Sequence, residues 1–172
     1  SNNFNIRYNL GLLNISPAPA SVNFTAASLS SVYDGKPKQA SVSTVPSGLS
    51  VTITYNGNNA LPVNAGAYTA QAIVTNPNYT GSSSTLLTIN QATATVTANN
   101  QVIKQKDPLP AFTATFGGFV NGETAQVVTN LSFTTNPVYS GAAGIYQVNP
   151  TATAKNYIFT PVAGTLYVNP YG

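Results

Sequence analysis

Residues 65–68 read Ala-Gly-Ala-Tyr, and residues 143–146 read Ala-Gly-Ile-Tyr, 78 positions further along the chain. A second pair of motifs, Asn78-Tyr79 and Asn156-Tyr157, has the same offset. Two motifs that share one offset indicate an internal repeat, and a fixed repeat length reveals architecture before any strand is assigned. The 172-residue sequence therefore predicts two tandem domains of about 75 to 80 residues each.

The first residues of the chain repeat the end of a domain. Residues 3–17 parallel residues 156–170, with an asparagine–aromatic pair at the start, a glycine in the middle and a proline at the end. We interpret residues 1–17 as the closing hairpin of a preceding repeat. Residues 18–91 and 92–172 are then the two domains, and we expect the chain to be an interior piece of a longer protein. No Gly/Ser linker separates the domains, so we expect a stiff connection.

The local pattern is typical of β-strands. Thr occupies every second position in residues 51–55 and in much of residues 92–98, which predicts half-buried antiparallel strands. Turn pairs such as Asn56-Gly57 and Asn121-Gly122 separate the strands. Short strands at this spacing predict an all-β fold of tandem immunoglobulin-like β-sandwiches, although the Cys and Trp hallmarks of antibody domains are missing.

Two tyrosines stand at equivalent positions of the repeat. Tyr68 and Tyr146 each follow a glycine turn at the start of a predicted strand. We expect both to be structural core tyrosines of the tyrosine-corner type, with the ring in the core and the hydroxyl on a nearby carbonyl. Other tyrosines, including Tyr33 and Tyr55, are expected on the surface, where they could offer stacking faces to sugars.

The composition argues against chemistry. His and Cys are absent, charged residues make up 5% of the chain, and the carboxylates are Asp34, Asp107 and Glu123. A hydroxyl nucleophile would lack a base, and calcium would lack its clustered carboxylates. We therefore expect no enzyme activity, cofactor or metal site, and Asp34 is expected to be a turn former. Few basic residues and no long apolar stretch argue against nucleic-acid binding and membrane insertion.

The second domain resembles a known bacterial repeat. Gly-Phe-Val-Asn-Gly-Glu-Thr at residues 118–124, together with the motifs at 143–146, 156–159 and 164–166, is similar to the MBG-type repeat of bacterial surface proteins. Gln105-Lys106-Asp107 departs from the Y-G-D-type turn of that pattern. Residues 20–90 resemble the companion YDG-type repeat through Tyr33-Asp34-Gly35. The resemblance implies a large extracellular protein that is secreted or attached to the bacterial surface.

The favoured function is therefore a structural stalk or spacer of an adhesin-like or fibre-forming protein. One alternative is an adhesin module whose loops bind a glycan or a protein. Another is a filament subunit that assembles by β-strand addition through residues 3–16, because isolated two-stranded ribbons are marginal in water and need a partner. The partners would be neighbouring repeats or identical copies, and the added strand would present Phe4, Ile6, Tyr8, Leu10, Leu13 and Ile15.

Overall fold

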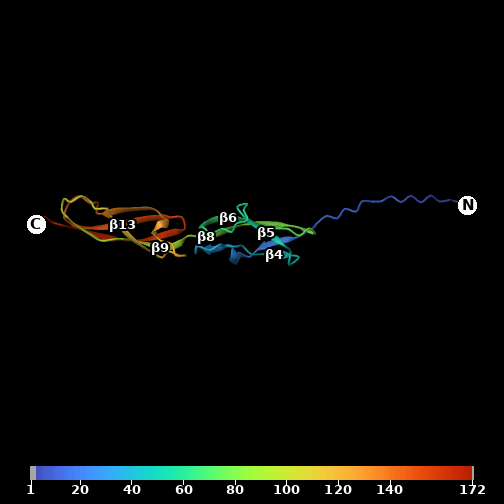
Figure 1. Ribbon diagram of the computed structural model, residues 1–172, viewed down its shortest axis with the longest axis horizontal. Coiled ribbons are helices and arrows are strands. Elements are labelled where there is room, and N and C mark those ends of the chain that lie inside the picture. The colour runs from blue at the N-terminus through green and yellow to red at the C-terminus, as the bar shows by residue number, and fades with distance from the viewer. Residues whose placement is uncertain (1–2, 172) are drawn as a thin grey trace.

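The structure is a computed structural model that describes residues 3–171. Two β-rich bodies lie end to end, and the N-terminal segment, residues 3–17, projects from one end of the molecule (Figure 1). The only helical elements in the described chain are two short 3-10 turns, η1 (Ala26–Ser28) and η2 (Ala125–Val127). The predicted all-β fold of tandem β-sandwiches is confirmed.

The first sandwich has one larger and one smaller layer. The larger layer contains, in spatial order, β3 (Ser30–Val32), β8 (Ser82–Asn90), β6 (Gly66–Val74) and β5 (Val51–Tyr55). The smaller layer contains two strand pairs, β1 (Ala18–Pro19) with β7 (Tyr79–Thr80), and β2 (Ser21–Phe24) with β4 (Val42–Val45).

The second sandwich repeats this arrangement. One layer contains β10 (Gln101–Lys104), β15 (Gly164–Asn169), β13 (Gly144–Ala154) and β12 (Val128–Asn136). The other layer contains β14 (Tyr157–Val162), β9 (Ala92–Ala98) and β11 (Ala114–Gly117). A single pairing of Ala154 with Tyr157 joins the two layers into one hydrogen-bonded sheet.

Alternation along the strands builds the two cores. On β6, Ala70, Ala72 and Val74 are buried while the residues between them are exposed. Tyr146 and Val148 are buried in the same way at the start of β13. Successive side chains of a strand point to opposite faces, so this pattern turns one face of each strand toward the core. The strands predicted at residues 51–55 and 92–98 are confirmed as β5 and β9 with the same bounds.

The predicted closing hairpin of residues 1–17 is wrong for the part that the structure describes. Residues 3–17 contain no strand, and residues 1 and 2 lie outside the described residues, as does residue 172 at the end of the second domain. The corresponding part of the second sandwich is not a hairpin either. There, β14 pairs in parallel with β9, whereas β15 pairs with β13 and β10.

The physical reason can be seen in the second sandwich, where the two consecutive strands β14 and β15 pair with different neighbours and not with each other. β14 and β15 follow each other with only Ala163 between them and belong to different layers. Where the chain crosses from one layer to the other, it passes close to the Ala98 carbonyl oxygen. A Cβ at position 164 would lie 2.4 Å from that oxygen, so the crossing requires the glycine that is found there. Residues 3–17 have the same sequence pattern, but within the described residues 3–171 they pair with no sheet, and an extended segment without partners forms no ladder.

Candidate functional site: the joint between the sandwiches

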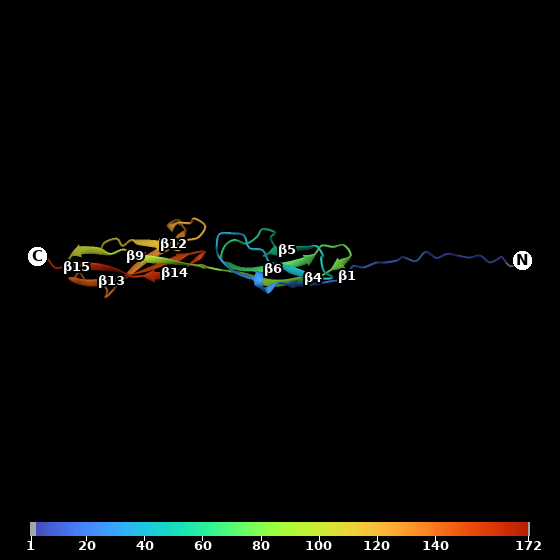
Figure 2. The same cartoon turned by 90° about the horizontal axis from the view of Figure 1, so that it is seen from below.

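The chain passes from one sandwich to the next through a single residue. β8 ends at Asn90 and β9 begins at Ala92, so Gln91 alone links them. The Gln91 side-chain amide donates hydrogen bonds to the carbonyls of Ala154 and Lys155, at 3.3 and 3.1 Å. Figure 2 shows loops of both sandwiches reaching toward this linker. We call this region the joint.

Glu123 holds a tyrosine from each sandwich. The Tyr33 hydroxyl of the first sandwich donates to Glu123 Oε1 at 2.6 Å, and the Tyr157 hydroxyl of the second donates to Glu123 Oε2. The Tyr157 hydroxyl also accepts the backbone N–H of Val120 at 3.0 Å. Hydrogen bonds to an ionised carboxylate are shorter and stronger than those between neutral groups. The carboxylate therefore connects both sandwiches with charge-assisted bonds.

The rings of these tyrosines form an apolar part of the joint beside the Glu123 carboxylate. Tyr33 is 4% exposed and Tyr157 is 2% exposed. Their centroids lie 5.6 Å apart with an interplanar angle of 82°, and Phe119 meets Tyr157 edge-on at 5.1 Å. Such aromatic pairs stabilise by about 0.5–1.5 kcal/mol beyond their burial. One hydrophobic cluster runs from Leu87 and Ile89 of the first sandwich to buried residues of the second, so the two cores are continuous at the joint.

A second set of polar contacts crosses the joint. The Asn156 side chain donates to Asn64 Oδ1 at 3.0 Å and accepts the backbone N–H of Ala65 at 2.9 Å. The Tyr68 hydroxyl donates to the Asn64 carbonyl at 2.8 Å. Tyr68 therefore braces, within the first sandwich, the turn that Asn156 contacts from the second.

The Tyr33-Asp34-Gly35 turn of the first sandwich lies against the second sandwich at the joint. Gly35 has a φ of +76°, and a Cβ there would lie 2.5 Å from the Asn121 side chain of the second sandwich. Asp34 accepts the backbone N–H of Lys36 at 2.9 Å, as predicted for a turn former, and pairs with Lys38 at 2.7 Å. The hydrogen bond from Lys38 and that from the Lys36 backbone lower the pKa of Asp34.

The electrostatics of the joint favour protonated tyrosines. The hydrogen bond to Glu123, followed by burial, raises the pKa of Tyr33 from 10.0 to about 12. Burial, followed by the same carboxylate, raises the pKa of Tyr157. A negative carboxylate beside a phenol disfavours the phenolate, which would bring a second negative charge into the joint.

The structure places the two repeat tyrosines in different surroundings. Tyr68 lies at the joint, whereas the Tyr146 hydroxyl donates to the Ala142 carbonyl at 2.9 Å, away from it in the second sandwich. The expectation that Tyr33 and Tyr55 are surface tyrosines is wrong. Tyr33 is covered by the second sandwich, and Tyr55, 3% exposed, accepts the Ala40 N–H on its hydroxyl.

The apolar residues predicted for strand addition all lie on the N-terminal segment and are more than two-thirds exposed: Phe4, Ile6, Tyr8, Leu10, Leu13 and Ile15. They take no part in the joint. The sequence reasoning missed the contact of Glu123 with Tyr33, and the pairing of Asn64 with Asn156. These residues belong to motifs that the sequence comparison singles out, but all four lie far from the boundary at residues 91 and 92, so the sequence carries no signal that brings them together.

The fold and the joint define a tandem β-sandwich repeat protein. Residues 20–93 match the family described as the MBG domain, and residues 94–167 match the MBG domain of YGX type. The chain therefore belongs to the MBG domain family, as two consecutive repeats. MBG domains are repeats of large bacterial surface proteins. Comparison with curated proteins gives no match.

Proposed function

We propose that this chain is a non-enzymatic spacer, formed by two repeats of an extracellular bacterial stalk that are held in line by a stiff joint. The observation that carries the proposal is the Glu123 carboxylate, which accepts hydrogen bonds from Tyr33 of one sandwich and Tyr157 of the next. A bend at the joint would break these bonds and expose two buried rings. Bending therefore costs free energy, which is the property that a spacer requires.

The acidic residues support the non-enzymatic part of the proposal. Glu123 serves the joint, Asp34 pairs with Lys38, and Asp107 accepts the backbone N–H of Lys104 at 2.9 Å. Each of the three carboxylates in the sequence therefore has a structural contact. No three His, Cys, Asp or Glu side chains within residues 3–171 gather where they could hold a metal ion.

The surface location of MBG repeats supports an extracellular position for this chain. In the part of the chain that the structure describes, no helix has the length and apolar character needed to cross a membrane. Antibody labelling of intact cells that make the full-length protein tests the location. Labelling that requires permeabilised cells would contradict it.

Small-angle X-ray scattering tests the spacer function. We expect the unaltered chain to scatter as one elongated particle. Insertion of Gly-Ser-Gly-Ser between Gln91 and Ala92 adds a flexible linker, so we expect a broader distribution of shapes and a shorter mean length. The same insertion after Val138, which is exposed in a loop of the second sandwich, is the control and should leave the joint intact. An unaltered chain that is as flexible as the linker variant would overturn the proposal.

A further inference from the structure

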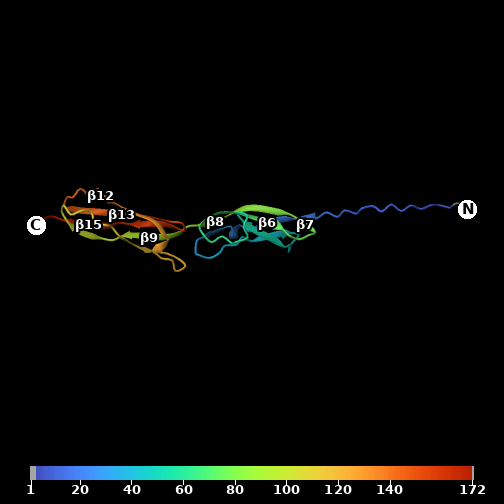
Figure 3. The ribbon, with the colours of Figure 1, turned by 45° about the horizontal axis from the view of Figure 1, so that its top comes forward.

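Each sandwich has two ends, and the joint uses one end of each (Figure 3). The first sandwich contributes a surface formed by Tyr33, Gly35 and Asn64, which we call the tyrosine face. The second contributes residues 118–127, between β11 and β12. We call them the glutamate loop, because Glu123 accepts the hydrogen bond from Tyr33. Since the two sandwiches have the same arrangement of strands, the remaining end of each one shows whether both repeats carry these two surfaces.

In the second sandwich, Gln105 stands in the place of Tyr33. β3 pairs in parallel with β8, as β10 does with β15. Directly after β3, the Tyr33 N–H donates to the Asn90 carbonyl at 2.8 Å. Directly after β10, the Gln105 N–H donates to the Asn169 carbonyl at 2.7 Å, so the two positions are equivalent. A glutamine supplies neither an aromatic ring to fill the joint nor a phenolic hydroxyl for the carboxylate.

The other two members of the tyrosine face are also replaced. Ala142 occupies the position of Asn64, because each supplies the carbonyl that the tyrosine hydroxyl of its own sandwich bonds. The turn after β10 reads Gln105-Lys106-Asp107-Pro108 and contains no glycine. Gly35, in contrast, leaves the space beside it to the Asn121 side chain. The far end of the second sandwich therefore lacks the phenol, the amide and the glycine of the tyrosine face.

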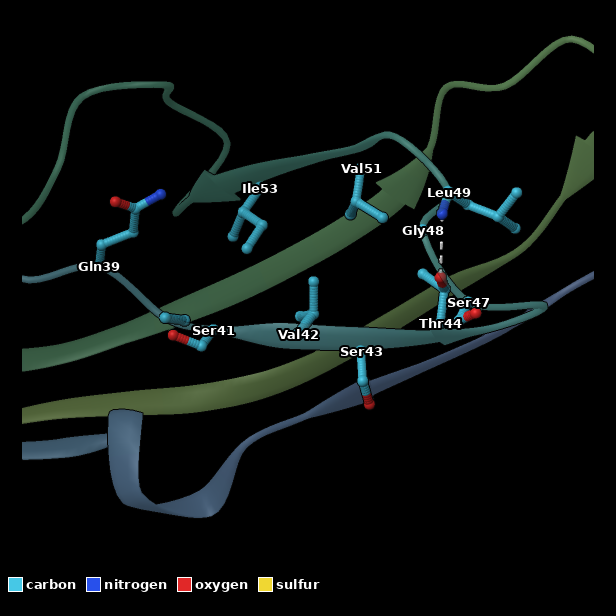
Figure 4. A pocket seen from close by; sticks show the side chains of 11 residues that line it. Gln39, Ser41, Val42, Ser43, Thr44, Ser47, Gly48, Leu49, Val51 and Ile53 are labelled. Carbon is cyan, nitrogen blue, oxygen red and sulfur yellow. Dashed lines mark hydrogen bonds between the residues drawn. The ribbon is translucent and has the colours of Figure 1, made fainter.

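The first sandwich likewise has no glutamate loop. β4 and β11 are equivalent strands, because β4 pairs antiparallel with β2 as β11 does with β9. β11 continues into the glutamate loop, whereas β4 continues into residues 46–50, a short turn before β5. This turn borders a pocket between β4 and β5 (Figure 4) and contains no acidic residue. Each of the two surfaces that meet at the joint is therefore carried by one repeat and not by the other.

We propose that the joint selects the order of the repeats, so that the tyrosine face accepts a following repeat that presents a glutamate loop and rejects one that does not. The inference rests on the proposed spacer function, because it concerns the same joint. A following repeat with a turn like residues 46–50 would leave the Tyr33 hydroxyl without its carboxylate. A glutamate loop set against the far end of the second sandwich would leave Glu123 without a phenol. Unpaired groups of this kind cost free energy when buried, and such costs discriminate between partners as well as favourable contacts do.

A chain with a second copy of the second sandwich tests this selection. It consists of residues 1–169, then Gln91, then residues 92–171, so the native joint and a new joint have the same single-residue linker. The sequence contains no cysteine, and spin labels can therefore be attached at introduced cysteines. Thr52→Cys and Ser132→Cys label the native joint, and Ser132→Cys in both copies labels the new one. The two positions are exposed and equivalent, since Thr52 lies opposite Ile73 as Ser132 lies opposite Thr151.

Electron paramagnetic resonance measures the distance distribution across each joint. We expect a narrow distribution at the native joint and one that is roughly twofold broader or more at the new joint, because domains without a matched interface move relative to each other. Three substitutions in the inner copy should convert its far end into a tyrosine face: Gln105→Tyr, Asp107→Gly and Ala142→Asn. They should narrow the distribution at the new joint and leave the native joint unchanged.

The outcomes separate the selection of order from the spacer function. A new joint that is as narrow as the native one without the substitutions would overturn the selection and leave the spacer function standing. A new joint that stays broad in a folded chain with the three substitutions would show that these residues do not select the neighbour. A broad distribution at the native joint would overturn the spacer function together with the inference that rests on it.

Two glycine variants of the unaltered chain test the tyrosine face if the converted sandwich does not fold. Gly35 and Gly48 have φ angles of +76° and +80°, so an alanine strains the backbone at either position. A Cβ at position 48 meets nothing within 4 Å, whereas a Cβ at position 35 lies 2.5 Å from the Asn121 side chain. Gly35→Ala should therefore broaden the distance distribution between labels at Thr52 and Ser132, and Gly48→Ala should leave it unchanged. Equal distributions in the two variants would overturn the selection by the tyrosine face.

Discussion

At the scale of single residues, one carboxylate carries much of the connection between the two repeats. Glu123 is one of three acidic residues in the chain, and it accepts hydrogen bonds from tyrosines of both sandwiches. Removing one partner of a buried hydrogen bond costs more than the bond contributes, because the remaining donor loses its hydration without compensation. The joint is therefore sensitive to changes at this position.

We expect Glu123→Gln to lower the free energy of unfolding by about 1.5–3 kcal/mol, the range for hydrogen bonds to charged groups. Urea denaturation measures this loss. A double-mutant cycle with Tyr33→Phe should show coupling, because the two side chains are in contact. Asp107→Asn is the control, since Asp107 caps a turn within the second sandwich. Its effect should add to that of Tyr33→Phe, and additivity in both cycles would contradict the contact.

Tyr33 should make the stability of the chain sensitive to high pH. Its pKa is about 12 in the folded chain, against an ordinary value of 10.0. Below pH 10 the hydroxyl is protonated in both states, and its contribution to stability is fully present. Between pH 10 and about 12 the unfolded chain ionises first, so the free energy of unfolding falls as pH rises.

The measurement is urea denaturation at several pH values across this window, with Tyr33→Phe for comparison. The variant lacks this group, so its stability should fall less steeply between pH 10 and 12. Because the other tyrosines are common to both chains, the difference in slope reports Tyr33. Parallel pH profiles would show that Tyr33 ionises equally easily in both states.

At the scale of elements, the same tyrosine corner has two different consequences. The hydroxyls of Tyr68 and Tyr146 each bond a backbone carbonyl four residues earlier. In the first sandwich this carbonyl belongs to Asn64, whose side chain contacts Asn156 across the joint. In the second sandwich it belongs to Ala142, which has no side-chain amide to offer. The tyrosine hydrogen bond is thus common to both sandwiches, and in the first sandwich it also holds the turn that contacts Asn156 across the joint.

Phenylalanine substitutions separate these two roles. Tyr68→Phe and Tyr146→Phe should each cost about 0.5–1.5 kcal/mol, the contribution of one hydrogen bond. Only Tyr68→Phe should loosen the turn that Asn156 contacts. Amide hydrogen exchange at Ala65, whose N–H donates to Asn156, should therefore accelerate in Tyr68→Phe and stay unchanged in Tyr146→Phe. The same exchange rate in both variants would rule out a role of Tyr68 in the joint.

At the scale of the whole molecule, the continuous core predicts cooperative unfolding. Domains of this size bury only about 60% of the surface that their unfolded chains expose, so burial at a shared joint is a considerable part of their stability. We expect calorimetry of the unaltered chain to show one transition with equal calorimetric and van't Hoff enthalpies. The Gly-Ser-Gly-Ser insertion after Gln91 should split it into two. Two transitions in the unaltered chain would mean that the sandwiches unfold independently.

Much of the fold was predictable because it depends on local sequence. Alternation located β5 and β9 with their observed bounds, since facing directions along a strand follow from the backbone itself. The Asn56-Gly57 and Asn121-Gly122 pairs adopt positive φ angles, as such turns require. The closing hairpin was mispredicted because two short alternating runs fit either a hairpin or one strand that changes layers. The position of the partner strands decides between them.

The repeat, the β-sandwich class and the family can be read from the amino-acid sequence alone, because periodicity and motif spacing are properties of the chain. The folded structure was needed to show that Tyr33 is buried, that Glu123 lies between two tyrosines, and that the first sandwich is open between β4 and β5. Tyr33 and Glu123 are 90 residues apart, and their contact depends on how two folded bodies meet end to end. No local backbone preference encodes that orientation, which comes from packing and hydrogen bonding between surfaces that exist only after folding.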